Sequence, residues 1–126
     1  MLDNNLPPVL ARGFSGLFAP THEVIHIREK FGVSNLTDEE WIVRLATEGG
    51  WSVLTGDIRI AKKRPSRELF LRSNIVGFFP APSLMKLPLH EKAARLLLRW
   101  EDLVSLSNLT QRATYEVPIR GKIRPI

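Results

Sequence analysis

Three aspartates occupy positions where ionised side chains could act together: Asp3, Asp38 and Asp57. Asp3 follows the apolar pair at 1–2, and Asp57 closely follows the apolar run at 53–55. Ligand sites in open α/β sheets form outside the carboxyl ends of the strands, so Asp3 and Asp57 are predicted to face one crevice. Carboxylates held close together repel one another unless a cation neutralises them, and oxygen ligands alone suit Mg²⁺ or Mn²⁺. The pattern therefore predicts a divalent-metal site.

Such a metal site has a defined chemistry. A bound divalent cation lowers the pKa of a water molecule, aims it at a phosphodiester and stabilises negative charge on the phosphate oxygens and the leaving group. This reaction requires neither a covalent nucleophile nor a histidine base. The acids thus favour phosphodiester hydrolysis.

A basic stretch directly follows the third aspartate. Residues 1–57 contain four Lys or Arg against eight Asp or Glu, whereas residues 58–126 contain fourteen against five. Cations beside an acidic centre are typical of proteins that bind a polyanion. We therefore expect contacts with the phosphates of a polyanion from Arg59, Lys62, Lys63, Arg64 and Arg67. The alternative is an ordinary solvated face.

The bulk composition limits the class of protein. A chain of 126 residues with 44% hydrophobic and 25% charged residues fits one globular domain, predicted to span 1–126. The chain has no cysteine, which excludes disulfides, thiolate metal sites and a cysteine nucleophile. We see neither a signal peptide at the start nor an apolar run long enough to cross a membrane. A cytoplasmic location without membrane association is the expectation.

Local patterns predict the elements that position the acids. Prolines suit the first turn of a helix, so a helix is expected at about 7–18, and a β-branched run predicts a strand at 22–27. Thr37 and Glu40 have the spacing of a capping box, which predicts a helix that starts there and ends at 49–50. A strand at 51–55 follows and ends just before Asp57.

The second half continues the alternation of strands and helices. A buried strand is expected at 75–79, a long helix at 89–106 and one further strand at 114–119. The long helix carries enough leucines either for the core or for the face of a homodimer. Alternating strands and helices predict an α/β fold with a mainly parallel central sheet covered by helices on both sides.

Three short motifs in order resemble one known family: Asp-x-Asn-Leu-Pro-Pro at 3–8, Thr-Asp-Glu-Glu at 37–40 and Leu-Thr-Gly-Asp at 54–57. The set resembles PIN-like domains, and within them the compact group that includes the VapC-type toxins of toxin-antitoxin pairs. The resemblance implies a three-layer α/β/α domain that binds Mg²⁺ or Mn²⁺, cleaves RNA and is blocked by a small antitoxin protein.

The same resemblance assigns roles to individual residues. Asp3, Asp38 and Asp57 are implied to be the catalytic metal-site acids, with Glu39, or else its neighbour, as a further metal ligand. Asn5 and Thr55 are implied to support them through hydrogen bonds. The resemblance covers a motif-bearing core at about 2–80, and more loosely the C-terminal helix and basic tail at 81–126.

Two departures from the family pattern affect the interpretation. Many relatives carry a further acid two residues after the third aspartate, where this chain has Arg59. The first strand is also short, which indicates either a minimal sheet edge or a true start upstream of Met1.

Two alternatives to a ribonuclease remain at the level of sequence. A PIN-like fold that has lost catalysis and binds RNA or protein is favoured by Arg59. A phosphoacceptor receiver domain fits less well, because the first strand is followed by Asp3-Asn4-Asn5 rather than by an acidic pair. The histidines at 22 and 26 lack the spacing of a metal site and are expected to be structural.

Overall fold

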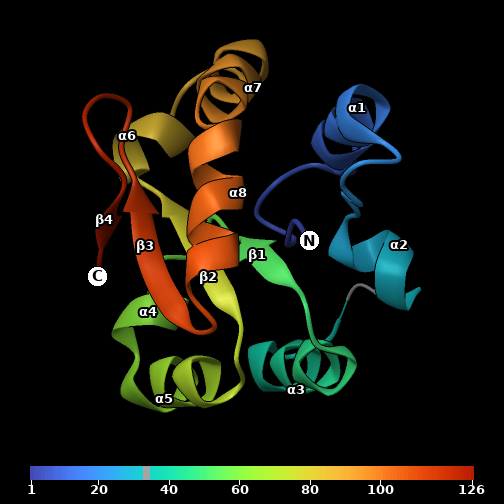
Figure 1. The fold of residues 1–126 in the computed structure, drawn as a ribbon, viewed down its shortest axis with the longest axis vertical. Coiled ribbons are helices and arrows are strands. Elements are labelled where there is room, and N and C mark those ends of the chain that lie inside the picture. The colour runs from blue at the N-terminus through green and yellow to red at the C-terminus, as the bar shows by residue number, and fades with distance from the viewer. Residues whose placement is uncertain (33–34) are drawn as a thin grey trace.

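A four-stranded sheet forms the centre of the computed structural model, which describes residues 1–32 and 35–126 apart from the side chains of Ala61 and Arg64 (Figure 1). The strands are β1 (Ser52–Leu54), β2 (Val76–Pro80), β3 (Ala113–Val117) and β4 (Arg124–Pro125), and they lie side by side in this order. β1 pairs with β2 and β2 with β3 in parallel, whereas β4 is antiparallel to β3. The mainly parallel sheet that the sequence predicts is confirmed.

Helices connect the strands. They are α1 (Pro8–Phe18), α2 (Ile27–Phe31), α3 (Asp38–Glu48), α4 (Arg59–Lys62), α5 (Arg64–Arg72), α6 (Pro82–Met85), α7 (Leu89–Leu98) and α8 (Trp100–Leu109). In Figure 1, α3, α4 and α5 lie together at the bottom of the view, away from α7 at the top. None of the helices in the described part of the chain has the length and apolar character needed to span a membrane.

Two separate hydrophobic cores lie on the two faces of the sheet. Neighbouring residues of one strand point to opposite faces, so Phe78 belongs to one core and Phe79 to the other. The first core packs α1, α6, α7 and α8 against the sheet, and the second packs α3, α4 and α5. This is the three-layer α/β/α arrangement that the PIN-like resemblance implies.

The N-terminal residues add a short extended segment next to β1. Leu2 forms parallel bridges to His26 on one side and to Leu54 on the other. The strand predicted at 22–27 is wrong, since that segment contributes only this one bridge and α2 begins at Ile27. The reason is local: the ring of His26 accepts a hydrogen bond from the amide of Arg28 at 3.1 Å and so caps α2.

The predicted start and end of α3 are confirmed. Thr37 accepts a hydrogen bond from the Glu40 amide at 3.2 Å, and the Glu40 carboxylate accepts one from the Thr37 amide at 2.8 Å. This reciprocal capping box fixes the first turn of the helix. At the other end Gly49 has a φ of 75°, a backbone conformation that glycine adopts without steric cost.

The long helix expected at 89–106 is divided into α7 and α8 at Arg99. The break lets Trp100 stack on Phe18 with a ring separation of 4.5 Å, and the Arg99 guanidinium donates to the carbonyl oxygens of Pro118 and Ile119 at 3.3 and 3.2 Å. Helical periodicity continues across the break, which is why the sequence predicts one helix. The contacts of Arg99 and Trp100 with distant residues accompany the break between α7 and α8.

Candidate metal site at the carboxyl ends of the strands

Asp3 and Asp57 lie at the same edge of the sheet because the segments that precede them run parallel. The amide of Asp3 donates to the Leu54 carbonyl at 3.2 Å, and the amide of Leu54 donates to the Met1 carbonyl at 2.9 Å. Both segments leave the sheet in the same direction. Asp3 comes directly after the Leu2 bridge, and Asp57 comes three residues after the end of β1. The sheet therefore brings the two acids together, as the sequence predicts for this edge.

Asp3 is almost fully buried and is surrounded by hydrogen-bond donors. Its Oδ2 accepts from the hydroxyl of Thr55, and its Oδ1 accepts from the amides of Asn5 at 3.1 Å and Gly56 at 3.4 Å. Burial raises the pKa of Asp3 above its ordinary value; the hydrogen bonds oppose that rise, and the charge of Asp57 adds to it. Burial is therefore the largest influence on the ionisation of Asp3.

Asp57 is held from two sides. Its amide donates to Thr55 Oγ1 at 3.1 Å, which links it to the residue that also binds Asp3. Its two carboxylate oxygens accept from Nε and Nη2 of Arg59 at 2.8 and 3.0 Å. This bidentate hydrogen bonding by Arg59 is the main cause that lowers the pKa of Asp57.

Asp38 approaches from the first turn of α3. Its Oδ1 accepts from the indole nitrogen of Trp41 at 3.1 Å. Partial burial is the main cause that raises the pKa of Asp38, and the charges of Asp57 and Glu39 raise it further. The charge of Asp57 therefore adds to the rise in the pKa of both Asp3 and Asp38, with burial as the larger cause in each.

The residues have the chemistry that a hard divalent cation requires, but the arrangement is incomplete. Burial and mutual repulsion of carboxylates both favour a cation among them. However, no group of three or more Asp, Glu, His or Cys within the described residues is arranged to hold a metal ion. Asp57 is bound to the Arg59 guanidinium instead. The carboxylate oxygens are thus the type of ligand that such an ion prefers, but both oxygens of Asp57 are bound to Arg59.

Comparison with known proteins identifies the family of the chain. A family model described as a PIN like domain matches residues 1–81, well over half of the chain. The chain belongs to the PIN-like domain family. Neither a curated protein nor a solved structure shows a significant match to it.

The other acids and the supporting residues of this PIN-like domain have distinct positions. Glu39 is exposed on the first turn of α3, and Glu40 is used by the capping box. Asn5 contacts Asp3 through its backbone amide, while Thr55 uses its side chain. The Thr55 side chain thus links the segment that carries Asp3 to the loop that carries Asp57.

The basic residues lie on α4 and α5 and at the turn between them. Lys62, Lys63 and Arg67 are exposed, and Arg67 also donates to the carbonyl oxygen of the last residue at 3.2 Å. The side chain of Arg64 lies outside the part that the structure describes. An exposed cationic surface therefore begins directly beside the acids.

Sequence reasoning missed two features of the site. Trp41 was available as a donor to Asp38, since residues three apart on a helix are neighbours. The ion pair within the Asp57-Ile58-Arg59 stretch was harder to foresee, because Arg59 was interpreted as an RNA contact. Opposite charges two residues apart at the start of a helix were the available signal.

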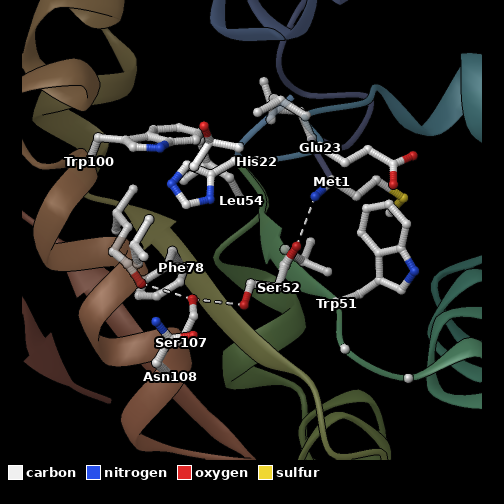
Figure 2. Close-up of a pocket in the computed structure, with 18 residues that line it drawn as sticks. Met1, His22, Glu23, Trp51, Ser52, Leu54, Phe78, Trp100, Ser107 and Asn108 are labelled. Carbon is white, nitrogen blue, oxygen red and sulfur yellow. Dashed lines mark hydrogen bonds between the residues drawn. The ribbon is translucent and has the colours of Figure 1, made fainter. Parts of the chain in front are cut away.

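A cavity of about 490 Å³ lies elsewhere, beside the start of β1. Figure 2 shows Trp100 and His22 on one side of it and Ser52 and Ser107 on another. The Ser52 hydroxyl donates to the Oγ of Ser107 at 2.8 Å. The Trp100 indole nitrogen is buried without a hydrogen-bond partner among the described residues. None of the three aspartates lines this cavity, so the acids at the carboxyl ends of the strands remain the candidate site.

Proposed function

We propose that this PIN-like domain is a metal-dependent endoribonuclease that holds Mg²⁺ or Mn²⁺ with Asp3, Asp38 and Asp57. The observation that carries the proposal is geometric: Asp3 and Asp57 lie at one edge of the sheet and are linked through the Thr55 hydroxyl. Burial and the charge of Asp57 disfavour ionisation of Asp3 and Asp38, and a bound cation would favour it. The family supports it, because PIN-like domains are often nucleases. Glu39 is exposed in the same helical turn as Asp38 and would be a further ligand.

The bound ion would supply an activated water and stabilise charge on the phosphate oxygens. The chain's own residues have other tasks. Thr55 orients Asp3 and, through its contact with the Asp57 amide, fixes the distance between the two segments. Trp41 orients Asp38. The exposed Lys62 and Lys63 would attract the phosphate backbone of RNA towards the acids.

Incubation of the purified protein with a mixed RNA pool and Mn²⁺ tests the proposal. We expect cleavage by the parent that stops on addition of EDTA. Asp3→Asn and Asp57→Asn should reduce the rate by at least about a hundredfold, since each removes a carboxylate from the ion that drives the reaction. Glu48→Gln, which changes an exposed acid at the far end of α3, is the matched control. Equal rates in all four proteins would refute the assignment.

A second candidate function is a binding module without catalysis. The observation that favours it is the bidentate Arg59 contact, which engages both oxygens of Asp57. Such a protein would retain RNA through its basic surface in EDTA and release it as salt rises, without cleaving it. Filter binding beside the cleavage assay separates the two functions.

The biological role that we propose is that of a toxin paired with a small antitoxin, acting in the cytoplasm. An apolar groove of about 450 Å³ between α1 and α7, lined by the exposed Val9, Leu17 and Leu89, supports a protein partner. We also propose that two copies of the protein form a homodimer. Growth arrest on expression of the parent, but not of Asp3→Asn, tests the toxin role, and light scattering of the pure protein gives its oligomeric state.

A further inference from the structure

The ion pair of Asp57 and Arg59 is asymmetric in its exposure. The side chain of Asp57 is only 15% exposed, whereas that of Arg59 is 72% exposed. Asp57 also accepts from the backbone amide of Arg59 at 3.1 Å, so the carboxylate is fixed at the start of α4. The guanidinium is the part of the pair that is free to move into solvent.

The guanidinium occupies the two oxygens that a metal ion would need. Nε and Nη2 of Arg59 each donate to a different oxygen of Asp57. The charge of Arg59 also acts on Asp38. A divalent ion held by these acids would therefore lie close to a positive charge that already neutralises part of the site.

We infer that Arg59 is an internal cation that competes with the divalent ion for Asp57, and that an RNA phosphate promotes metal binding by drawing the guanidinium away. The inference rests on the proposed function, whose metal site it deepens. Within the described residues, the Arg59 side chain donates hydrogen bonds to no group other than Asp57. A phosphate forms the same bidentate contact with arginine as a carboxylate does, so it can replace Asp57 as the partner.

The exchange is accessible because the guanidinium is 72% exposed and can leave Asp57 for solvent. A phosphate then supplies the bidentate partner that the guanidinium loses. The phosphate backbone of RNA brings several negative charges to the surface formed by α4 and α5. Release of Arg59 would thus couple binding of the substrate to completion of the metal site.

Titration with Mn²⁺ alone, followed by electron paramagnetic resonance of the free ion, tests the competition without any activity measurement. The proteins are the parent, Arg59→Ala, Arg59→Gln and the control Lys62→Ala, which removes an exposed cation from the same helix α4. We expect both Arg59 variants to bind Mn²⁺ about five- to tenfold more tightly than the parent, the factor that loss of a bidentate ion pair with one exposed partner supplies. Lys62→Ala should change the affinity less than about twofold.

A second titration contains a 2′-O-methyl RNA oligonucleotide as the source of phosphates. We expect the oligonucleotide to tighten Mn²⁺ binding by the parent and to leave the affinity of Arg59→Ala nearly unchanged, because that variant has no guanidinium to release. Tightening of the same size in both proteins would overturn the coupling to Arg59.

The outcomes separate this inference from the proposed function. Equal Mn²⁺ affinity in the parent and both Arg59 variants, with RNA cleavage by the parent intact, would overturn the role of Arg59 and leave the nuclease standing. Absence of Mn²⁺ binding in every protein would overturn both. Tighter binding in Arg59→Ala that persists when Asp57→Asn is added would place the ion elsewhere and also overturn the inference.

Discussion

Thr55 joins Asp3 to the loop that carries Asp57. Its hydroxyl donates a hydrogen bond to Asp3 Oδ2, and the same oxygen accepts one from the Asp57 amide at 3.1 Å. Thr55 is fully buried at the end of β1, so its side chain has no water to replace either contact. One hydroxyl thus sets the relation between two acids that are 54 positions apart in the sequence.

Replacement of Thr55 by valine should be costly although the two side chains have the same shape. Thr55→Val leaves Asp3 Oδ2 and the Asp57 amide without a buried partner, and we expect the free energy of unfolding to fall by about 2 kcal/mol at neutral pH. Urea denaturation measures the change. Thr47→Val is the control, since Thr47 is exposed and donates only to the Val43 carbonyl within α3. A similar small loss in both variants would contradict the role of Thr55.

The sequence predicted most of the elements because their signals are local. The capping box of Thr37 and Glu40, and the apolar run that becomes β2, each determine an element within a few residues. The strand expected at 22–27 failed because the cap formed by the His26 ring starts α2 there. The helix expected at 89–106 is divided by long-range contacts of Arg99, which no periodicity reveals.

The site was predictable in part for the same reason. Parallel strands bring Asp3 and Asp57 to one edge whatever the side chains do, so strand order sufficed. The pairing of Arg59 with Asp57 depends on rotamers at the start of α4, which spacing does not define. Sequence reasoning could therefore bring Asp3 and Asp57 to one edge but could not show that Arg59 pairs with Asp57.

Burial of Asp3 makes its ionisation unfavourable for folding, and this gives a pH dependence of defined sign. The pKa of Asp3 in the folded state lies above its ordinary value of 3.8, so the folded state binds the proton more tightly than the unfolded chain does. Its contribution to stability is therefore fully present below pH 3.8 and is lost as the pH rises through the folded-state pKa. Asp3→Asn should lack this loss.

Urea denaturation of both proteins across a pH series tests that prediction. We expect the stability of Asp3→Asn relative to the parent to increase as the pH rises from 3.8 and to level off above the folded-state pKa of Asp3. Mn²⁺ should reduce the difference at neutral pH, because it stabilises the ionised parent. A difference that is constant with pH, or that decreases, would show that burial does not control this carboxyl.

Asp38 and Glu39 are adjacent acids in the first turn of α3, yet they should respond differently to metal. Asp38 is partly buried beside Trp41, whereas Glu39 is exposed. At an Mn²⁺ concentration about a hundred times the dissociation constant, the ion should stabilise the parent by about 2.7 kcal/mol. We expect Asp38→Asn to lose most of this stabilisation and Glu39→Gln to keep at least half of it.

Thermal unfolding with and without Mn²⁺ gives the stabilisation in each variant. Both substitutions remove a negative charge from the start of the same helix, so any effect through the helix dipole is matched. Equal loss of the Mn²⁺-dependent stabilisation in the two variants would contradict the distinction between Asp38 and Glu39.

His26 is a structural residue whose two ring nitrogens have separate tasks. Nδ1 accepts from the Arg28 amide at 3.1 Å, which assigns the proton to Nε2, and Nε2 donates to the Leu6 carbonyl at 2.7 Å. His26→Ala loses the cap, both hydrogen bonds and buried volume, and we expect a loss of about 3 kcal/mol in the free energy of unfolding. His26→Asn keeps an oxygen that can cap α2, so it should lose about 1 kcal/mol less. Urea denaturation would contradict this role if alanine and asparagine were equivalent.

Two glycines should respond to alanine in opposite directions. A Cβ atom on Gly56 would lie 2.6 Å from Met85 Cε and 2.8 Å from Asn5 Cβ. The Asn5 Cβ is bonded to the backbone of the loop whose amide donates to Asp3, so it cannot move away without moving that loop. Gly56→Ala should therefore lower the free energy of unfolding by about 1–3 kcal/mol and weaken Mn²⁺ binding. A Cβ on Gly13 in α1 would meet nothing within 4 Å, so Gly13→Ala should stabilise the protein by about 0.5–1 kcal/mol. The two changes add the same methyl group, so a stability gain in both would show that the loop after β1 has room to move, and that close packing at Gly56 does not hold Asp3 in place.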